Sequence, residues 1–359
     1  MKSKLLLLLL LLLAAGSLHA ANALTPIATR DKKVIRRWTL PGDPRGVAAG
    51  ADGTIYIGLA ESQSVIAVDP ATGVIRRQIV LDSAEIAATK ELVTLRTNPA
   101  RSRLYIANGS DESALILSLP DLAVLREITM EGETLRDALP DPKGRYVYLL
   151  GRHVHVYDQD GRTRLRSLDV DDPMAIATSA SGSILAVFAT EDFGNAKATS
   201  VSLFDTTTFA LLAREPLQTE KNVEAALFAA GDRSLIAFSR DSLFEKRMVS
   251  RPVRIAGQEG TRMRVELGDL VNSNRVCLPE RSGAQIATLA GSDTLLVYGE
   301  RRCSASGAFS GSAHGITPAS LYGIDAYAMA YDPKTGSLAV TDRAGFLTIY
   351  SVPRPALAK

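Results

Sequence analysis

The chain has 359 residues, of which 46% are hydrophobic and 22% charged, a balance that excludes a disordered tail, a collagen-like repeat and a small disulfide-stapled protein. The formal net charge is only +2, and Lys2 and Lys4 at the very start account for it, so nothing indicates a nucleic-acid partner. A single hydrophobic core rarely grows beyond roughly 250 to 300 residues, so the length requires either two domains or a closed repeat architecture.

The first 23 residues have the pattern of an export signal. Two lysines precede an apolar run from Leu5 to Ala15, and the tripeptide Ala-Asn-Ala at 21–23 is a small-x-small cleavage site. An apolar run of 11 residues spans about half of a ~30 Å hydrocarbon layer, which disfavours a membrane anchor. We therefore expect residues 1–23 to be removed, leaving a chain that begins at Leu24, has no membrane span and is periplasmic or secreted.

A short motif returns about forty residues after its first appearance. Val-Ile-Arg-Arg stands at 34–37 and again at 74–77, and residues 123–129 repeat the pattern more weakly. Short β-type runs such as Thr54 to Gly58 and Ser64 to Val68 lie between, separated by turns that contain Asp-Gly or Pro and Gly. Four short strands in about forty residues are typical of a β-propeller blade.

The same template fits seven successive units, at 45–81, 92–130, 135–170, 173–218, 223–266, 283–324 and 326–353. The last unit has only three strands, and Val34 to Leu40 is an unassigned copy of a fourth. We therefore predict an all-β, seven-bladed propeller in one domain, 24–359, in which the N-terminal strand completes the last blade and closes the ring. Because the fifth and sixth units are irregular, six or eight blades are the alternatives.

The run Leu-Tyr-Ile-Ala-Asn at 104–108 resembles the Tyr-Val-Thr-Asn signature of the YVTN-type β-propeller repeat. The surrounding frame is similar too, with Pro-x-Gly-Val-Ala at 44–48, Asp-Gly at 52–53 and Val-Asp-Pro-x-Thr-Gly at 68–73. The likeness covers the first three units and the last, and fades between 240 and 317. It implies an exported bacterial propeller, but members of this family do many unrelated things, so it leaves the function open.

Two histidines have the spacing of metal ligands. His153 and His155 alternate on an expected strand at 152–157, so both belong to one sheet face. No third His or Cys lies in that unit, and the faces of a blade normally pack on neighbouring blades. We therefore favour a packing role and predict no metal site.

No catalytic residue or cofactor is predicted. The sequence contains neither Cys-x-x-Cys-His for covalent haem nor Gly-x-Gly-x-x-Gly for a dinucleotide, and its one tryptophan cannot supply the repeated tryptophans of quinone-binding propellers. His314 lies near Ser310 and Ser312, but the stretch lacks the glycines of a nucleophile elbow. We expect a flexible Gly- and Ser-rich loop there.

A basic stretch interrupts the otherwise neutral chain between residues 246 and 264. Its candidate partner-binding residues are Lys246, Arg247, Arg251 and Arg254, followed by Arg262 and Arg264, against the single acid Glu259. Two interpretations are open, a solvated blade edge or loop, and a docking surface for an anionic ligand or protein partner.

Export would place both cysteines in an oxidising compartment. Cys277 and Cys303 are then expected to form an intramolecular disulfide, since two thiols without a suitably spaced histidine make a poor zinc site.

The function that fits these features is an exported, non-enzymatic scaffold or a ligand-binding or partner-binding propeller. Two alternatives from a different class are a channel-centred, metal-dependent hydrolase such as a lactonase, and the propeller subunit of a periplasmic dehydrogenase whose cofactor belongs to another chain.

Overall fold

The structure is a computed structural model, and it describes the following residues: 23–27, 34–81, 93–108, 112–193, 196–217, 223–229, 232, 234–239, 242–254, 261–272, 285–288, 294–299, 317–322, 326–332, 334–342 and 344–351.

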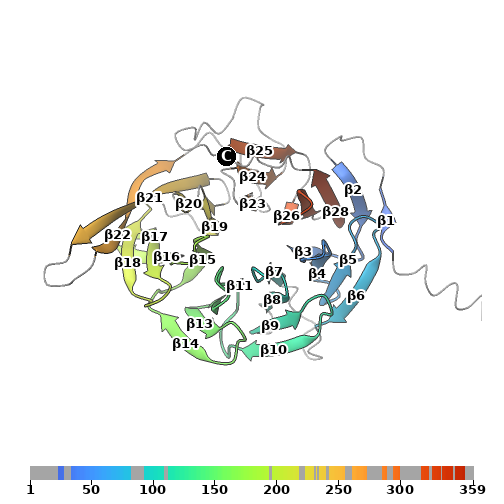
Figure 1. Cartoon of the computed structure of the whole chain (residues 1–359), viewed down its shortest axis with the longest axis horizontal. Coiled ribbons are helices and arrows are strands. Elements are labelled where there is room, and N and C mark those ends of the chain that lie inside the picture. The colour runs from blue at the N-terminus through green and yellow to red at the C-terminus, as the bar shows by residue number, and fades with distance from the viewer. Residues whose placement is uncertain are drawn as a thin grey trace, which may run out of the picture.

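The sheets stand side by side in a ring around a central axis (Figure 1). The described residues form five four-stranded sheets, one five-stranded sheet and one three-stranded sheet. In the four-stranded sheets, strands consecutive in sequence pair antiparallel, and the first strand lies nearest the axis while the fourth lies at the perimeter (Figure 1). This arrangement is a β-propeller, as the repeat predicted.

Five sheets follow one another along the chain as blades. The first contains β3 (Pro44–Ala49), β4 (Ile55–Leu59), β5 (Ser64–Val68) and β6 (Ile75–Val80). The second contains β7 (Val93–Thr97), β8 (Arg103–Asn108), β9 (Ser113–Ser118) and β10 (Val124–Thr129). The third contains β11 (Asp137–Pro140), β12 (Tyr146–Leu150), β13 (Val154–Asp158) and β14 (Arg164–Leu168). The fourth contains β15 (Pro173–Thr178), β16 (Ile184–Phe193), β17 (Ala196–Asp205) and β18 (Leu211–Pro216). The fifth contains β19 (Val223–Ala229), β20 (Ser234–Ser239), β21 (Ser242–Arg254) and β22 (Thr261–Asn272).

The predicted closure of the ring by the N-terminal strand is confirmed. In the closing blade, β26 (Ala326–Asp332), β27 (Ser337–Asp342) and β28 (Phe346–Ser351) are completed by β2 (Val34–Thr39), which pairs antiparallel with β28. A short fifth strand, β1 (Thr25–Pro26), pairs with the outer edge of β2. Trp38 of β2 is buried, and its indole Nε1 donates to the carbonyl oxygen of Pro70 in the first blade at 3.2 Å. The closing strand therefore also contacts the blade on the other side of the seam.

The hydrophobic core lies between neighbouring blades. One buried cluster joins Tyr56 of β4 to Leu104 of β8, and the next joins Tyr105 of β8 to Val147 of β12. Adjacent residues of one strand therefore face different blades, because their side chains alternate between the two sheet faces. A ring built in this way adds blades without thickening any one core, so the fold can hold a long chain.

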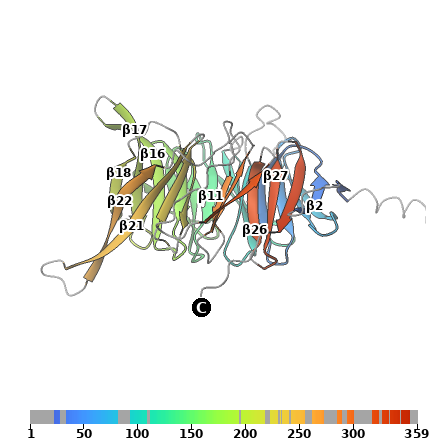
Figure 2. The ribbon, with the colours of Figure 1, turned by 90° about the horizontal axis from the view of Figure 1, so that it is seen from above.

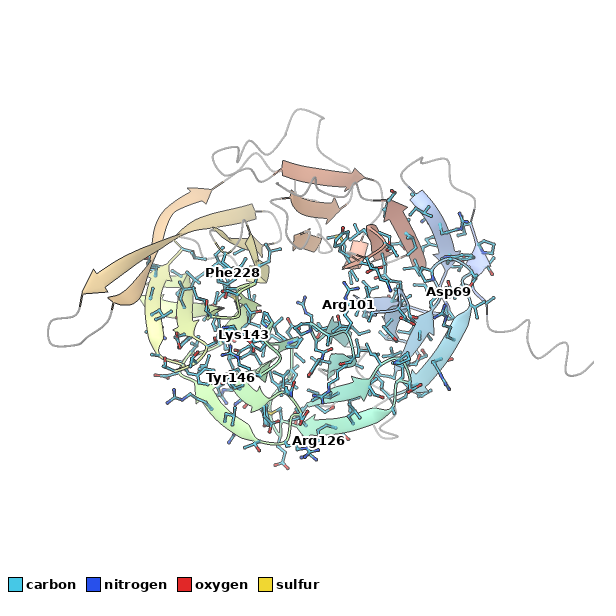
Figure 3. The ribbon with its side chains drawn as sticks, in the orientation of Figure 1. Asp69, Arg101, Arg126, Lys143, Tyr146 and Phe228 are labelled. Atoms are coloured by element: carbon cyan, nitrogen blue, oxygen red, sulfur yellow. The ribbon has the colours of Figure 1, made fainter. Side chains whose placement is uncertain are left out.

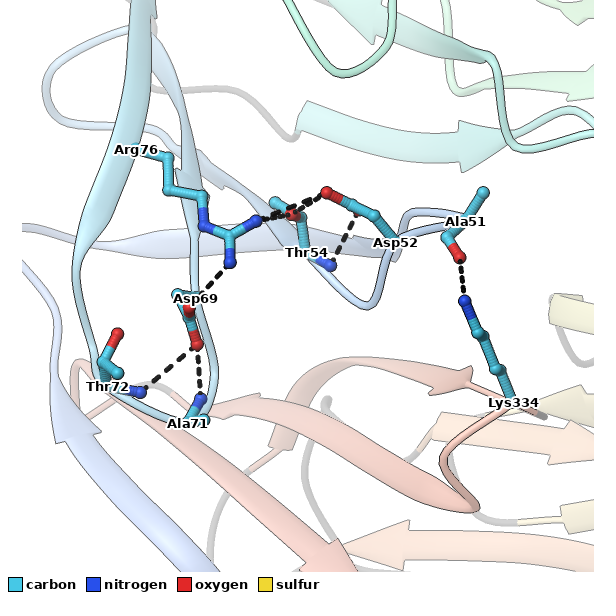
Figure 4. Close-up of polar contacts among 8 residues, drawn as sticks. All are labelled: Ala51, Asp52, Thr54, Asp69, Ala71, Thr72, Arg76 and Lys334. Carbon is cyan, nitrogen blue, oxygen red and sulfur yellow. Dashed lines mark hydrogen bonds and ion pairs between the residues drawn. The ribbon is translucent and has the colours of Figure 1, made fainter.

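Aspartates build the turns between strands. The Asp69 carboxylate accepts hydrogen bonds from the backbone N–H groups of Ala71 and Thr72 at 2.9 and 3.3 Å, and Nη2 of Arg76 donates to it at 2.7 Å (Figure 4). Burial opposes ionisation, but these donors outweigh it and lower the pKa of Asp69. The turn ends at Gly73, whose positive φ of 73° favours glycine. The arginine of the repeated motif thus holds the turn that precedes it.

The structure departs from the repeat in the last third of the chain. The three-stranded sheet contains β23 (Gln285–Thr288), β24 (Thr294–Gly299) and β25 (Thr317–Tyr322), and β24 and β25 run parallel, unlike the strands of a regular blade. Two hairpins are also unusually long. They are β16–β17 and β21–β22, and they project beyond opposite faces of the disc (Figure 2).

Candidate interaction surface

The basic stretch at 246–264 lies in the β21–β22 hairpin, whose two strands extend outside the ring (Figures 1 and 2). Lys246 and Arg247 pair with residues of β20 on the other side of β21, so their backbone belongs to the body of the fifth blade. Arg251 and Arg254 lie further along β21, where the pairing is with β22 and no longer with β20. We call the projecting part, residues 248–254 with 261–267, the cationic ribbon. The four predicted residues are thus divided between the blade and the ribbon.

The pairing register groups the arginines of the ribbon. Arg251 pairs with Arg264, and two positions further along Val253 pairs with Arg262. Pairs two steps apart share one face of a two-stranded ribbon, so these three arginine positions belong to the same face. Arg254, which pairs with Thr261, belongs to the other face. Sequence reasoning placed Arg262 and Arg264 in the stretch but could not group them, because only the register decides which positions lie opposite one another.

The residue types on the two faces of the ribbon differ. The pairs that alternate with the arginines are Met248 with Leu267, Ser250 with Val265, and Pro252 with Met263. Apart from the Arg254–Thr261 pair, one face is therefore largely apolar by composition. The other has three arginine positions and one acid, Glu266, which pairs with Val249. Like charges directly opposite each other destabilise a two-stranded ribbon, so the Arg251–Arg264 position favours an anionic neighbour.

The two histidines considered as metal ligands lie side by side, with ring centroids 6.0 Å apart, and both contact Glu133. His155 lies in β13 and is buried, with Nδ1 at 2.8 Å from Oγ of Ser167 and Nε2 at 3.0 Å from both carboxylate oxygens of Glu133. His153 precedes the strand, and its backbone N–H donates to Glu133 at 3.4 Å. His155 is therefore buried and ties the connection between the second and third blades to the third blade.

Glu133 is held as a carboxylate. Burial opposes its ionisation, but hydrogen bonds from His155 and from the backbone of Arg152 and His153 outweigh that cost and lower the pKa of Glu133. Sequence reasoning missed this residue because it lies between two repeat units, where no motif marks it. Within the described part of the chain, no group of three or more His, Cys, Asp or Glu residues is arranged to hold a metal ion.

A second polar centre lies on the face of the disc formed by the turns between the first and second strands of the blades. Arg101, in the second blade, donates through Nη1 to Oδ1 of Asp332 at 2.8 Å and to the carbonyl oxygen of Gly50 at 3.1 Å. Asp332 belongs to the closing blade and Gly50 to the first blade, so one guanidinium joins three blades across the seam. Arg101 lies on the side of the ring nearest its axis (Figure 3). Asp332 is only 2% exposed, and its hydrogen bonds outweigh burial and lower its pKa.

Arginines of the outer strands make a third set of contacts, from each blade to the next. Arg126 Nε donates to the carbonyl oxygen of Gly161 at 3.5 Å, and Arg166 Nη1 donates to that of Thr208 at 3.2 Å. Arg77 lies 3.9 Å from a carboxylate oxygen of Asp121. Arg77 and Arg126 of the repeated motif, and Arg166 outside it, therefore link blades at the perimeter, a role that the recurrence of the motif did not reveal.

Several predictions concern residues outside the described part of the chain. These are the disulfide between Cys277 and Cys303, the loop that carries Ser310, Ser312 and His314, and residues 1–22 of the export signal. They stay predictions.

No family model and no curated protein sequence matches the chain. Among solved structures, the chain is similar to the β-propeller domain of Cps50 (Swd1) from Myceliophteria thermophila, with a TM-score of 0.57 and 14% sequence identity. The match covers 92% of this chain and 99% of the Cps50 chain. The described residues include no helix long and apolar enough to cross a membrane. At this level of identity the similarity shows the fold alone.

Proposed function

We propose that this chain is an exported, non-enzymatic β-propeller of seven blades, related to the YVTN-type repeat proteins, that binds an anionic protein partner through the cationic ribbon. The blade count is supported by the five regular blades, the three-stranded sheet and the closing blade. The export signal and the oxidising compartment that it implies come from the sequence.

The observation that carries the proposal is the ribbon itself. A hairpin that leaves a rigid ring gives up contacts with neighbouring blades, yet it brings three arginine positions onto one face. Arginine forms bidentate hydrogen bonds with carboxylate and phosphate groups, and the backbone of the ribbon projects beyond the disc (Figure 2). The other arginine centres are already engaged, because Arg101 and Arg76 form ion pairs within the ring.

Charge reversal tests the ribbon. Immobilised poly-L-glutamate is the probe, and binding of the purified chain is measured as salt is raised. Replacing Arg251, Arg262 and Arg264 together by Glu should weaken binding by about tenfold or more, about 1.4 kcal/mol, because exposed charges act mainly on association. Binding by the unaltered chain should fall as salt screens the arginines.

The matched control reverses three exposed cations of the third blade, Lys143, Arg152 and Arg162, whose side chains lie apart from the ribbon. Both triple variants should melt at nearly the temperature of the parent. If both lose binding equally, the probe senses net charge alone, and the ribbon is only solvated surface. A stoichiometric divalent metal together with lactone turnover would replace the proposal by the hydrolase alternative.

A further inference from the structure

The most exposed large apolar side chains of the described residues all lie in, or directly beside, the outer strands of the blades. They are Ile35, Val74, Val80, Val124, Leu125, Leu165 and Leu211. A scattered exposed aliphatic residue is ordinary, but here they recur at equivalent places around the perimeter.

The outer strands of the second and third blades combine this apolar surface with positive charge. Val124 and Leu125 of β10 are 53% and 52% exposed, and Leu165 of β14 is 48% exposed. The same two strands carry three arginines, Arg126, Arg164 and Arg166, against the single acid Glu127. Figure 3 places Arg126 at the perimeter, where its Nε donates to the carbonyl oxygen of Gly161 in the turn before β14. We call the edge strand β10, together with β14 of the next blade, the outer edge.

The closing blade shows how such an edge is used. There β1 pairs with the outer edge of β2, with Thr25 opposite Thr39 and Pro26 opposite Trp38. The backbone N–H of Ile27 donates to the carbonyl oxygen of Arg37 at 2.9 Å, and Ala23 forms a β-bridge with Val74. An extended segment of this chain therefore already lies along the perimeter, beside the same Val-Ile-Arg-Arg motif.

In the second and third blades, by contrast, β10 and β14 are the last strands of their sheets within the described residues. A strand at the edge of a sheet presents backbone N–H and C=O groups that can pair with another chain. Exposed aliphatic side chains on that strand give a partner strand apolar contacts, and the arginines select for acidic residues in it.

We propose that the outer edge binds an extended segment of a partner protein, rich in aliphatic and acidic residues, which adds as a further strand to the edge of β10 and reaches the side chains of β14 in the next blade. This surface is separate from the cationic ribbon, and its test is independent of the function proposed above.

The probe is a fluorescent peptide of alternating Val and Glu residues, and its anisotropy is measured with the full chain. The parent should bind it, and exchanging Glu for Lys or inserting proline at alternate positions should abolish binding, because proline cannot donate to a strand. Replacing Arg126 and Arg164 by Glu together with Leu125→Ser and Leu165→Ser should weaken binding by about tenfold or more.

The control is the triple ribbon variant, Arg251, Arg262 and Arg264 to Glu, which should bind the peptide like the parent. Equal affinity for the Val-Glu and Val-Lys peptides, or unchanged affinity after the outer-edge substitutions, would overturn the proposal. Binding to phosphatidylglycerol vesicles without binding to the peptide would also overturn it. The same holds if the peptide does not bind and the chain self-associates in a way that the outer-edge substitutions abolish.

Discussion

Arginines serve different purposes in the regular blades and in the cationic ribbon. In the regular blades Arg76 pairs with Asp69, and Arg145 pairs with Asp141 and donates to the carbonyl oxygen of Gly182 in the next blade. In the ribbon, the pairing register places Arg251 opposite Arg264, so two cationic positions lie directly across from each other. The comparison shows that these blade arginines stabilise contacts within the ring, whereas the arginine positions of the ribbon belong to a hairpin that projects from it.

The largest expected effect comes from removing the strand that closes the regular ring. Deleting residues 34–40 exposes the β28 edge and removes Trp38 and Leu40, which are 6% and 5% exposed. The free energy of unfolding should fall by roughly 5 kcal/mol or more, from lost burial and the cavity left behind. Denaturant unfolding measures it. Deleting residues 354–359 is the control, and equal losses for the two truncations would refute the role of the closing strand.

The second prediction compares a buried arginine contact at the seam, that of Arg101, with the exposed contact of Arg77. Arg101→Ala leaves the carboxylate of Asp332, 2% exposed, without its guanidinium partner and should cost about 3 kcal/mol. Arg77→Ala removes only the 3.9 Å contact between two exposed side chains and should cost under about 1 kcal/mol. Similar chemical-unfolding midpoints for the two variants would mean that Arg101 is not a clasp across the seam.

Substitutions at two turn glycines test whether the cost of adding a Cβ atom comes mainly from steric contact or from the backbone conformation. At Gly73 a Cβ would meet the ring of Trp38 at 2.7 Å, whereas at Gly53, which also has a positive φ, it would meet open space. Gly73→Ala should therefore cost about 2 to 3 kcal/mol, and Gly53→Ala about 1 kcal/mol, the backbone cost alone. Thermal unfolding of the pair gives the comparison, and the reverse order would contradict it.

The smallest expected effect is a dependence of stability on pH at the link between the second and third blades. The pKa of Glu133 lies below its ordinary value of 4.5, so its contribution is fully present above pH 4.5 and is lost as pH falls through the lowered pKa. Glu133→Gln should lower the free energy of unfolding by about 1 kcal/mol at neutral pH, and it should reduce the loss of stability that the parent shows as the pH becomes acidic. Unfolding measured between neutral and acidic pH tests it, and an unchanged slope in the variant would exclude Glu133 as its source.

The prediction was most complete for the elements that repeat. The motif at 34–37 and 74–77 identified matching outer strands, and the pairing of β2 with β28 confirmed that the first copy closes the ring. It was least informative for contacts between units. Neither Arg101 nor Glu133 stands out locally, because the partner of the first is 231 residues away and the second lies outside any strand.

By itself, the sequence determined that the chain alternates short strands with Asp, Pro and Gly turns at a period of about forty residues, because these preferences act over a few neighbouring residues. Only the tertiary structure decided which positions meet: the blades that Arg101 joins, the buried pair of His155 and Glu133, and the arginines that share one face of the ribbon. These contacts depend on strand register and on the closure of the ring. Both are set by the simultaneous packing of all blades, and no local segment encodes them.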